Sequence, residues 1–171
     1  MKPSLKAVEI ALENELNEKD FYLEQSSRVT NPVGKKMFET IAAEEDQHHR
    51  QLLEIHKNLE KTGQWPESIS PVVDETDIKK GLKNLIDTFE NSAVSTSDDK
   101  AAIKIAIEFE RKAYDFYQDL IQKTKSPDET KFFKYMAAIE HKHVVSLEDT
   151  LLYLEDPASW LMTAEKSLLD G

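Results

Sequence analysis

The chain has 171 residues, which is the length of one domain of ordinary size. Its 33 acidic and 22 basic side chains give a formal charge of −11. This charge argues against nucleic acid as a partner, because nucleic-acid binding depends on Lys and Arg side chains that neutralise phosphates. Because the sequence contains no cysteine, it excludes disulfides, thiolate-bound zinc, iron–sulfur clusters and four-thiolate iron centres.

The composition favours long helices, since it combines only 4 Gly and 6 Pro with abundant Ala, Leu, Glu and Lys. No window approaches the ~18 apolar residues of a membrane span. The charged, amphipathic start also lacks the apolar block of a secretory signal. We therefore expect a cytoplasmic protein that has no membrane partner.

Four segments of helical length follow one another, at about residues 4–29, 33–60, 99–125 and 127–154. Each carries apolar residues at the 3.6-residue period of an amphipathic helix. Ser126, Pro127 and Glu129 have the pattern of a capping box with Pro at the first helical position, and Asn31-Pro32 begins the second segment similarly. The sequence thus predicts an all-α fold.

The first two segments are repeated by the last two. A shift of 95 residues, without any gap, places 15 residues of the range 10–52 on identical residues, too many for unrelated segments. The matched positions are Ile10, Ala11, Glu13, Glu15, Asp20, Phe21, Tyr22, Pro32, Lys36, Phe38, Ala42, Ala43, Glu45, His48 and Leu52. The chain therefore contains two copies of one helical hairpin.

We expect a single domain over residues 1–171. It divides into hairpin 1 at about 4–60, a crossover at about 61–98, hairpin 2 at about 99–154 and a C-terminal segment at 155–171. The crossover contains one predicted short helix with an apolar face formed by Ile78, Leu82, Leu85, Ile86 and Phe89. A connection this long is expected to pack across the bundle, as in four-helix bundles with one long crossover. Trp160 in the C-terminal segment indicates a helix that docks on the bundle or a dimer contact.

Each of the four apolar stripes is interrupted by a glutamate, and two of the glutamates are followed three residues later by a histidine on the same helix face. These residues are Glu15, Glu45, His48, Glu110, Glu140 and His143. Four carboxylates in one core repel one another and are costly to desolvate, so a positive charge must compensate them. Two divalent ions supply +4 against −4. Four carboxylates with two imidazoles suit iron or manganese, and zinc is compatible with the same ligands.

This pattern resembles the rubrerythrin-like di-iron carboxylate proteins of the ferritin-like superfamily, over roughly residues 7–56 and 100–150. The resemblance implies a four-helix bundle with a crossover and two iron ions per chain. It implies that Glu45 and Glu140 bridge the metals, and that Glu15 and Glu110 are terminal carboxylates. By the same resemblance, His48 and His143 bind one metal each.

The sequence also departs from that family. A rubredoxin domain is not expected, because cysteine is absent, so electrons would come from an external donor such as a rubredoxin-type protein. Peroxidase-type members carry an additional carboxylate one turn beyond the third helix's glutamate, where this chain has Ala113. Glu18, one turn beyond Glu15, offers a similar carboxylate in the first hairpin. Haem is not expected, because Asp46 stands where the related bacterioferritins have a haem-binding Met.

Tyr22 and Tyr117 follow ligand glutamates by seven residues, about 10 Å along the helix axis. Helical side chains slant toward the N-terminus, so both hydroxyls are expected to hydrogen-bond ligand glutamates and assist catalysis from there. The alternative is an ordinary core tyrosine. His49, His56 and His141 lie off the ligand stripes and are expected to be exposed.

Three functions fit these observations. The first is a non-haem di-iron oxidoreductase that reduces hydrogen peroxide or dioxygen, with peroxide reduction favoured by the family resemblance. The second is an iron-handling protein, a ferroxidase, store or carrier without peroxidase turnover. The third, a helical interaction protein with exposed carboxylates, is disfavoured by the duplicated ligands. We expect a homodimer.

Overall fold

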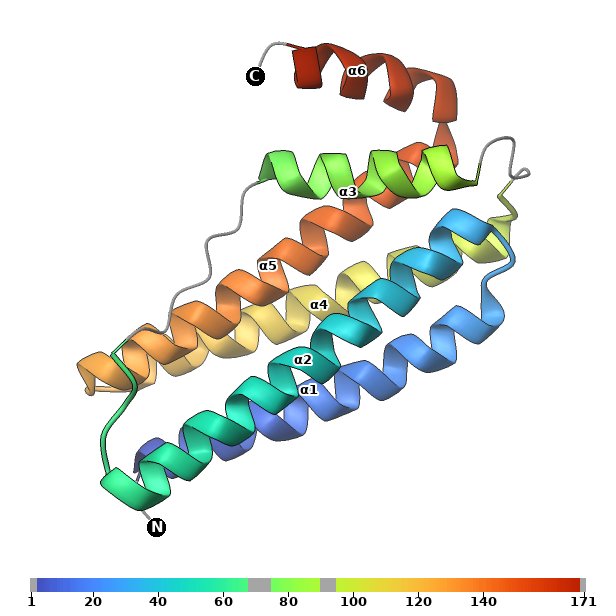
Figure 1. Cartoon of the computed structure of the whole chain (residues 1–171). Coiled ribbons are helices and arrows are strands. Elements are labelled where there is room, and N and C mark those ends of the chain that lie inside the picture. Colours follow the sequence, from blue (N-terminus) through green and yellow to red (C-terminus); the bar gives the residue numbers. More distant parts are fainter. Residues whose placement is uncertain (1–2, 68–74, 90–94, 170–171) are drawn as a thin grey trace.

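The computed structural model describes residues 3–67, 75–89 and 95–169. Within these ranges the chain is helical and contains no strand, which confirms the all-α, ferritin-like architecture predicted from the sequence. The described helices, shown in Figure 1, are α1 (Pro3–Arg28), α2 (Pro32–Thr62), α3 (Glu75–Thr88), α4 (Ser97–Lys123), α5 (Pro127–Glu155) and α6 (Pro157–Leu169).

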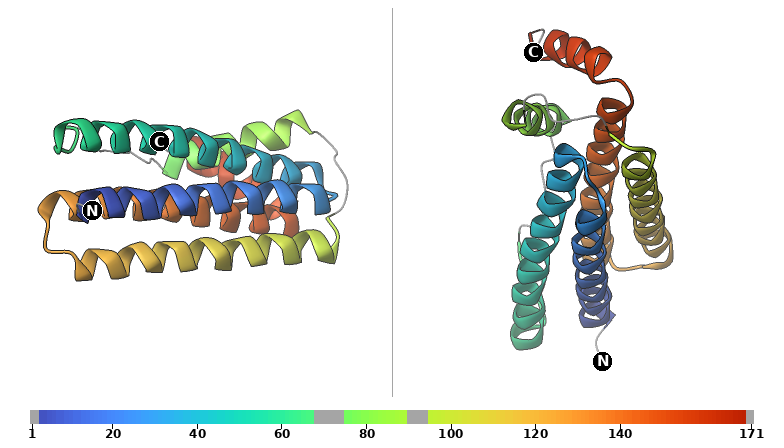
Figure 2. Two further views of the ribbon diagram at one scale, coloured as in Figure 1. Left: turned by 90° about the horizontal axis from the view of Figure 1, so that it is seen from below. Right: turned by 90° about the vertical axis from the view of Figure 1, so that its right-hand side faces the viewer.

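Two antiparallel hairpins, α1–α2 and α4–α5, lie side by side and form the four-helix bundle (Figures 1 and 2). The hairpins match in structure as they do in sequence. A shift of 95 residues carries α1 to 98–123, where α4 covers Ser97–Lys123, and it carries Pro32 onto Pro127. The duplication therefore sets the lengths and starting points of the helices in both halves.

A polar cap begins the second helix of each hairpin. Asn31 accepts hydrogen bonds from the backbone N–H groups of Val33 and Gly34, which start α2. Ser126 accepts one from the N–H of Glu129 at the start of α5. The predicted capping box is only half formed there, because the Glu129 carboxylate accepts from the Thr124 hydroxyl instead of the Ser126 N–H.

The crossover contains α3, which packs against α5, α2 and α6 at one end of the bundle (Figure 1). Leu82 and Ile86 of the predicted apolar face are buried, and Leu85 and Phe89 pack against the same core. The side chain of Ile78 and residues 68–74 and 90–94 of the crossover lie outside the described part of the chain. Burial of this face explains why a connection of this length is compatible with a compact bundle.

The C-terminal helix α6 docks on α5 and α3. The Trp160 ring is buried, contacts the Tyr153 ring edge-on, and donates a hydrogen bond from its indole N–H to Asp149. Met162 on the same helix is exposed. Trp160 therefore anchors α6 to its own bundle, which is the docking alternative expected from the sequence.

Two apolar clusters fill the bundle. The Phe38 cluster includes Tyr22, Phe38, Ile41, Ile103, Ile107 and Leu147, together with Leu82 and Trp160 from α3 and α6. The Phe133 cluster includes Val8, Ala11, Leu52, Tyr117, Phe133 and Met136. In each bundle helix, one half packs in the Phe38 cluster and the other half packs in the Phe133 cluster. The midpoint of each helix therefore lies between the two clusters. The glutamates of the apolar stripes occupy those midpoints.

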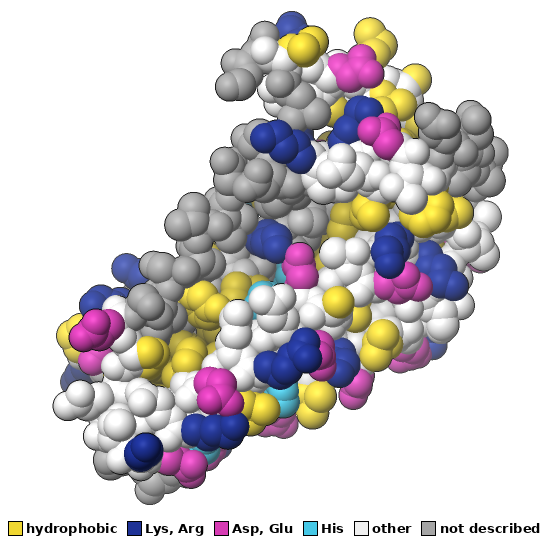
Figure 3. All heavy atoms as spheres, viewed as in Figure 1, with side chains coloured by type: hydrophobic (Ala, Val, Ile, Leu, Met, Phe, Trp, Pro, Cys, Tyr) yellow, Lys and Arg dark blue, Asp and Glu magenta, His cyan; other side chains and the backbone are white. Residues whose placement is uncertain are grey.

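The outer surface mixes charges. Figure 3 shows Lys and Arg side chains beside Asp and Glu side chains on the face that carries α2. Charged side chains of α2 also form ion pairs within the helix, such as the pair of Arg50 with Asp46 and that of Lys57 with Glu54. Among the described residues, no helix has the length and apolar character that crossing a membrane requires.

Asp99 joins the two hairpins at one end of the bundle. It is buried and completes a capping box with Thr96 at the start of α4. Its carboxylate also accepts hydrogen bonds from the backbone N–H groups of Thr30 and Asn31, in the turn between α1 and α2. Burial acts to raise the pKa of Asp99, but these donors outweigh it and lower the pKa below its ordinary value.

We predict that Asp99→Ala lowers the free energy of unfolding by about 2–4 kcal/mol, because it removes a helix cap together with the hydrogen bonds that join α4 to the turn between α1 and α2. Chemical denaturation of the wild type and the variant measures the difference. Asp98→Ala, an exposed carboxylate in the same helical turn, is the matched control and should change little.

The effect should depend on pH. The pKa of Asp99 is lowered by folding, so its contribution is fully present above the unfolded-state pKa of about 3.9 and is lost as the pH falls through the lower folded-state value. The stability difference between wild type and Asp99→Ala should therefore shrink only in the acid range. An equal difference at neutral and strongly acid pH would contradict this account.

Candidate metal centre

The four bundle helices bring one glutamate each to the middle of the core. Glu15 of α1, Glu45 of α2, Glu110 of α4 and Glu140 of α5 are all 0% exposed. The two histidines that follow three residues after Glu45 and Glu140 join the same cluster. The structure thus brings together all six side chains that the sequence singled out as candidate ligands.

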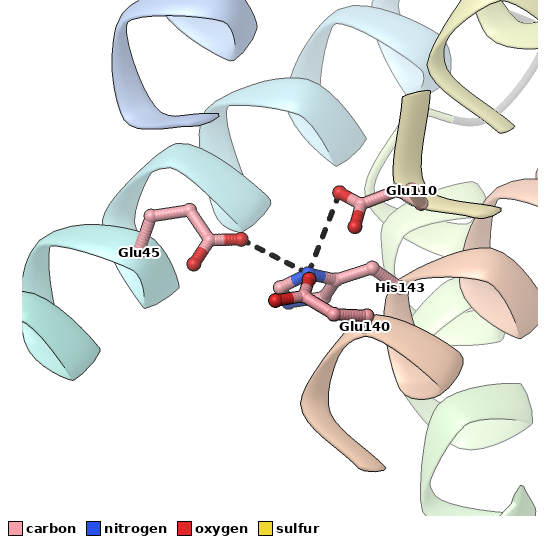
Figure 4. Close-up of side chains that lie close together, drawn as sticks. All are labelled: Glu45, Glu110, Glu140 and His143. Carbon is pink, nitrogen blue, oxygen red and sulfur yellow. Dashed lines mark ion pairs between the residues drawn. The ribbon is translucent and has the colours of Figure 1, made fainter. Parts of the chain in front are cut away.

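His143 is fully buried and faces three carboxylates from three helices (Figure 4). Its Nδ1 atom lies 2.9 Å from Glu45 Oε1, 3.5 Å from Glu110 Oε1 and 3.9 Å from Glu140 Oε2. Ligand atoms of these four residues all lie within 4.8 Å of one another. An ion among them would have carboxylate and imidazole ligands from α2, α4 and α5.

A second group surrounds His48, whose side chain is 16% exposed. Its Nδ1 atom lies 3.2 Å from Glu15 Oε2 and 3.2 Å from Glu45 Oε2. Glu45 therefore takes part in both histidine groups, with one oxygen directed to each. Glu140 connects the His143 group to Glu15, because Glu140 and Glu15 both belong to a third group of side chains whose ligand atoms lie within 4.8 Å of one another. Shared carboxylates of this kind suit two ions bound side by side.

Glu18 is the third member of the group that contains Glu15 and Glu140. It is 3% exposed, although it is not one of the six predicted ligands. The equivalent position in the second hairpin is Ala113, so this carboxylate has no counterpart in the other half. The core therefore holds five glutamates, one more than the duplicated pattern alone requires.

Burial and mutual repulsion shift the protonation of the cluster. Burial raises the pKa of Glu15 to about 8, and it raises the pKa of Glu18 and Glu140 together with their neighbouring carboxylates. Burial acts to lower the pKa of His48, but Glu15 and Glu45 outweigh it and raise this pKa to about 9. Without metal, the cluster is thus held near neutrality by protons, which bound cations would displace.

The donor atoms fit a pair of divalent ions. Among the described residues, neither oxygen of Glu140 has a hydrogen-bond partner, and the same is true of one oxygen each of Glu18 and Glu110. Buried polar atoms are rarely left in this state, because each unpaired group costs about 1–3 kcal/mol. Cations coordinated by these atoms would satisfy them, and the oxygen and imidazole set suits iron or manganese.

The two tyrosines are not equivalent. The Tyr22 hydroxyl donates a hydrogen bond to Glu110 Oε1, from α1 across to α4. The hydroxyl of Tyr117 instead accepts a hydrogen bond of 3.3 Å from Asn14, and it makes no hydrogen bond to a glutamate among the described residues. Phe109 occupies the position equivalent to Asn14 and stacks on Phe21. The expected hydroxyl-to-glutamate contact is therefore present in one half only.

One residue beside the cluster was missed by the sequence analysis. Glu44 Oε2 lies 3.1 Å from Nε2 of His143, and its other oxygen accepts a hydrogen bond from Lys142. Burial acts to raise the pKa of Glu44, but His143 and Lys142 outweigh it and lower the pKa to about 2. A carboxylate next to a predicted ligand was a visible signal, but Glu44 falls outside the stripe that marked the other glutamates.

The remaining histidines lie outside these groups. His141 is exposed, as expected. The expectation was wrong for His49 and His56, which are half-buried. His56 lies between Glu9 of α1 and Glu60 of α2, so the neighbouring helix covers part of its ring.

We predict that Glu140→Ala lowers the bound metal from two ions per chain, because it removes two oxygens that no other described residue satisfies. Elemental analysis of protein loaded with Fe(II) without oxygen measures this stoichiometry. Glu148→Ala, on the same helix but in a surface ion pair with Arg111, is the matched control and should retain the wild-type content. Unchanged metal in Glu140→Ala would reject this residue as a ligand.

Comparison with known proteins agrees with this geometry. The model of the rubrerythrin family matches residues 6–151, a range that contains all of the buried glutamates and both clustered histidines. No curated protein and no solved structure matches the chain significantly. The buried Glu and His cluster fits a di-iron site, as expected of this family. The chain belongs to the rubrerythrin family.

Proposed function

We propose that this protein is a non-haem di-iron oxidoreductase that reduces hydrogen peroxide, or dioxygen, with electrons from an external donor. The observation that carries the proposal is the buried cluster itself, in which both hairpins supply carboxylates and an imidazole. A purely structural bundle would have no reason to place five mutually repelling glutamates in its core.

In this proposal, Glu45 and Glu140 would be shared by two iron ions, and Glu15 and Glu110 would each complete the ligand set of one ion. His48 and His143 would each provide one imidazole nitrogen. The position of Glu45 between the two histidines, with one oxygen near each, supports its bridging role. When bound, the iron pair would supply the two-electron redox chemistry that breaks an O–O bond.

Reduction of hydrogen peroxide consumes two electrons and two protons and gives two water molecules. Glu18 is buried beside Glu15 and Glu140 and is not one of the six proposed ligands, so its carboxyl group is available to carry one of these protons. The hydroxyl of Tyr22 orients Glu110 through the hydrogen bond that it donates to the Oε1 atom of that glutamate. The rings of Phe21, Phe38 and Phe109 surround Tyr22 and limit the access of bulk water.

The electron donor and the quaternary structure belong to the same proposal. The chain has no cysteine and thus no four-thiolate iron centre of its own, so a rubredoxin-type protein is a suitable donor. We further propose that the protein acts in the cytoplasm as a homodimer.

We predict that hydrogen peroxide oxidises the Fe(II)-loaded protein faster than dioxygen does. Stopped-flow absorption after mixing with equal concentrations of either oxidant measures both rates. The Glu140→Ala variant is the control, because it shows how fast iron bound outside the buried centre is oxidised. A stoichiometric reaction with dioxygen, followed by accumulation of many irons per subunit, would instead support the iron-storing ferroxidase alternative.

We also predict that Tyr22→Phe retains two irons per chain but lowers the rate of peroxide reduction by about 10–100-fold, since it removes the hydroxyl that orients Glu110. Tyr117→Phe is the matched control, because Tyr117 makes no hydrogen bond to a glutamate among the described residues. Equal rates for the two variants would contradict a special role for Tyr22.

A further inference from the structure

The two halves of the metal centre differ at the position of Glu44, which contacts Nε2 of His143 and is replaced by Ile139 in the other half. We propose that Glu44 is a positioning residue for His143 alone, so that its loss weakens metal binding at the His143 position and leaves the His48 position unchanged. This inference rests on the proposed pair of metal ions, and it adds that the two positions are held by different means.

Glu44 is well placed to hold His143. Its Oε2 atom lies 3.1 Å from Nε2 of His143, on the opposite side of the ring from the Nδ1 atom that faces the carboxylates. Its Oε1 atom accepts a hydrogen bond of 2.9 Å from Nζ of Lys142. The lysine therefore holds the carboxylate in place while its second oxygen meets the imidazole.

This contact determines which nitrogen of His143 is free to bind metal. A proton on Nε2, donated to Glu44, leaves the lone pair of Nδ1 directed into the cluster. The negative charge of Glu44 beside Nε2 also makes Nδ1 of the imidazole a stronger metal ligand. Because His143 is fully buried, no water can replace the carboxylate at small cost.

The other half has no such contact. The residue equivalent to Glu44 is Ile139, a buried side chain in the Phe133 cluster. The Nε2 atom of His48 has no hydrogen-bond partner among the described residues, and its side chain is partly exposed. Water is therefore the available partner for Nε2 of His48, and the ring is held mainly by its contacts with Glu15 and Glu45.

A simple surface ion pair between Glu44 and Lys142 is the competing explanation. Such a pair needs only one carboxylate oxygen, and its contribution would not depend on which histidine is present. The second oxygen of Glu44 is directed instead at a buried imidazole. The two explanations therefore differ in whether the effect of Glu44 requires His143.

Calorimetric titration of metal-free protein with Co(II) tests whether the effect of Glu44 requires His143. The titration is carried out in two variants, each of which retains one of the two histidines. His48→Ala retains the His143 position, and His143→Ala retains the His48 position. Glu44→Gln should weaken Co(II) binding by about 10–100-fold in the first background and leave it unchanged in the second. Glu54→Gln, an exposed residue on the same helix, should have no effect in either.

An equal loss in both backgrounds, or no loss in the first, would overturn the inference. If the wild-type protein binds two Co(II) ions while Glu44→Gln has no effect, only this inference fails. If the wild type binds none, the proposed metal centre fails with it.

Glu44→Gln keeps the shape of a partly exposed side chain, so helical content by circular dichroism should remain that of the wild type.

A spectroscopic measurement gives an independent readout. In Zn(II)-loaded protein, the imidazole N–H of His143 should be visible by nuclear magnetic resonance and exchange slowly with water, because Glu44 accepts it. The imidazole N–H of His48 should exchange faster. Glu44→Gln should accelerate exchange at His143 only, and unchanged exchange there would count against the inference.

Discussion

Mutual repulsion among carboxylates buried in one core is the constraint on which this fold and its chemistry depend. Five glutamates lie at the midpoints of the bundle helices between two apolar clusters, where each charge is costly to desolvate. Protons balance the cluster in the absence of metal, as the raised pKa of Glu15 indicates. A pair of divalent cations would balance it better, because it would also satisfy the unpaired oxygens. The apolar clusters and the caps hold the helices in register against this repulsion.

Duplication supplies the scaffold, and the departures from duplication make the surroundings of the two proposed metal positions different. Both hairpins carry the same glutamate and Glu-x-x-His pattern, so each delivers equivalent ligands to the centre. The departures are Glu18 against Ala113, Glu44 against Ile139 and Asn14 against Phe109. All of them lie next to the cluster or to its tyrosines. A two-metal centre that starts symmetric can thus acquire one position that differs in charge and rigidity from the other.

Much of this arrangement could be predicted from the sequence. A glutamate in an apolar helix stripe is conspicuous, and its repetition after 95 residues identified Glu15, Glu45, Glu110 and Glu140 without any coordinates. The contact between Glu44 and His143 could not be predicted, because it depends on the rotation of α2 relative to α5. The partner of Tyr117 and the incomplete cap at Ser126 depend in the same way on side-chain rotamers, which periodicity does not determine.

The central claim is that cations stabilise this fold by neutralising its buried carboxylates. Thermal unfolding of the metal-free protein at neutral pH, measured as Mn(II) is added, tests it most directly, since Mn(II) suits the ligand set without introducing iron oxidation. The account predicts that the melting temperature rises with Mn(II) concentration, because an ion that binds only the folded state stabilises it. A melting temperature that does not change with Mn(II) would contradict the account.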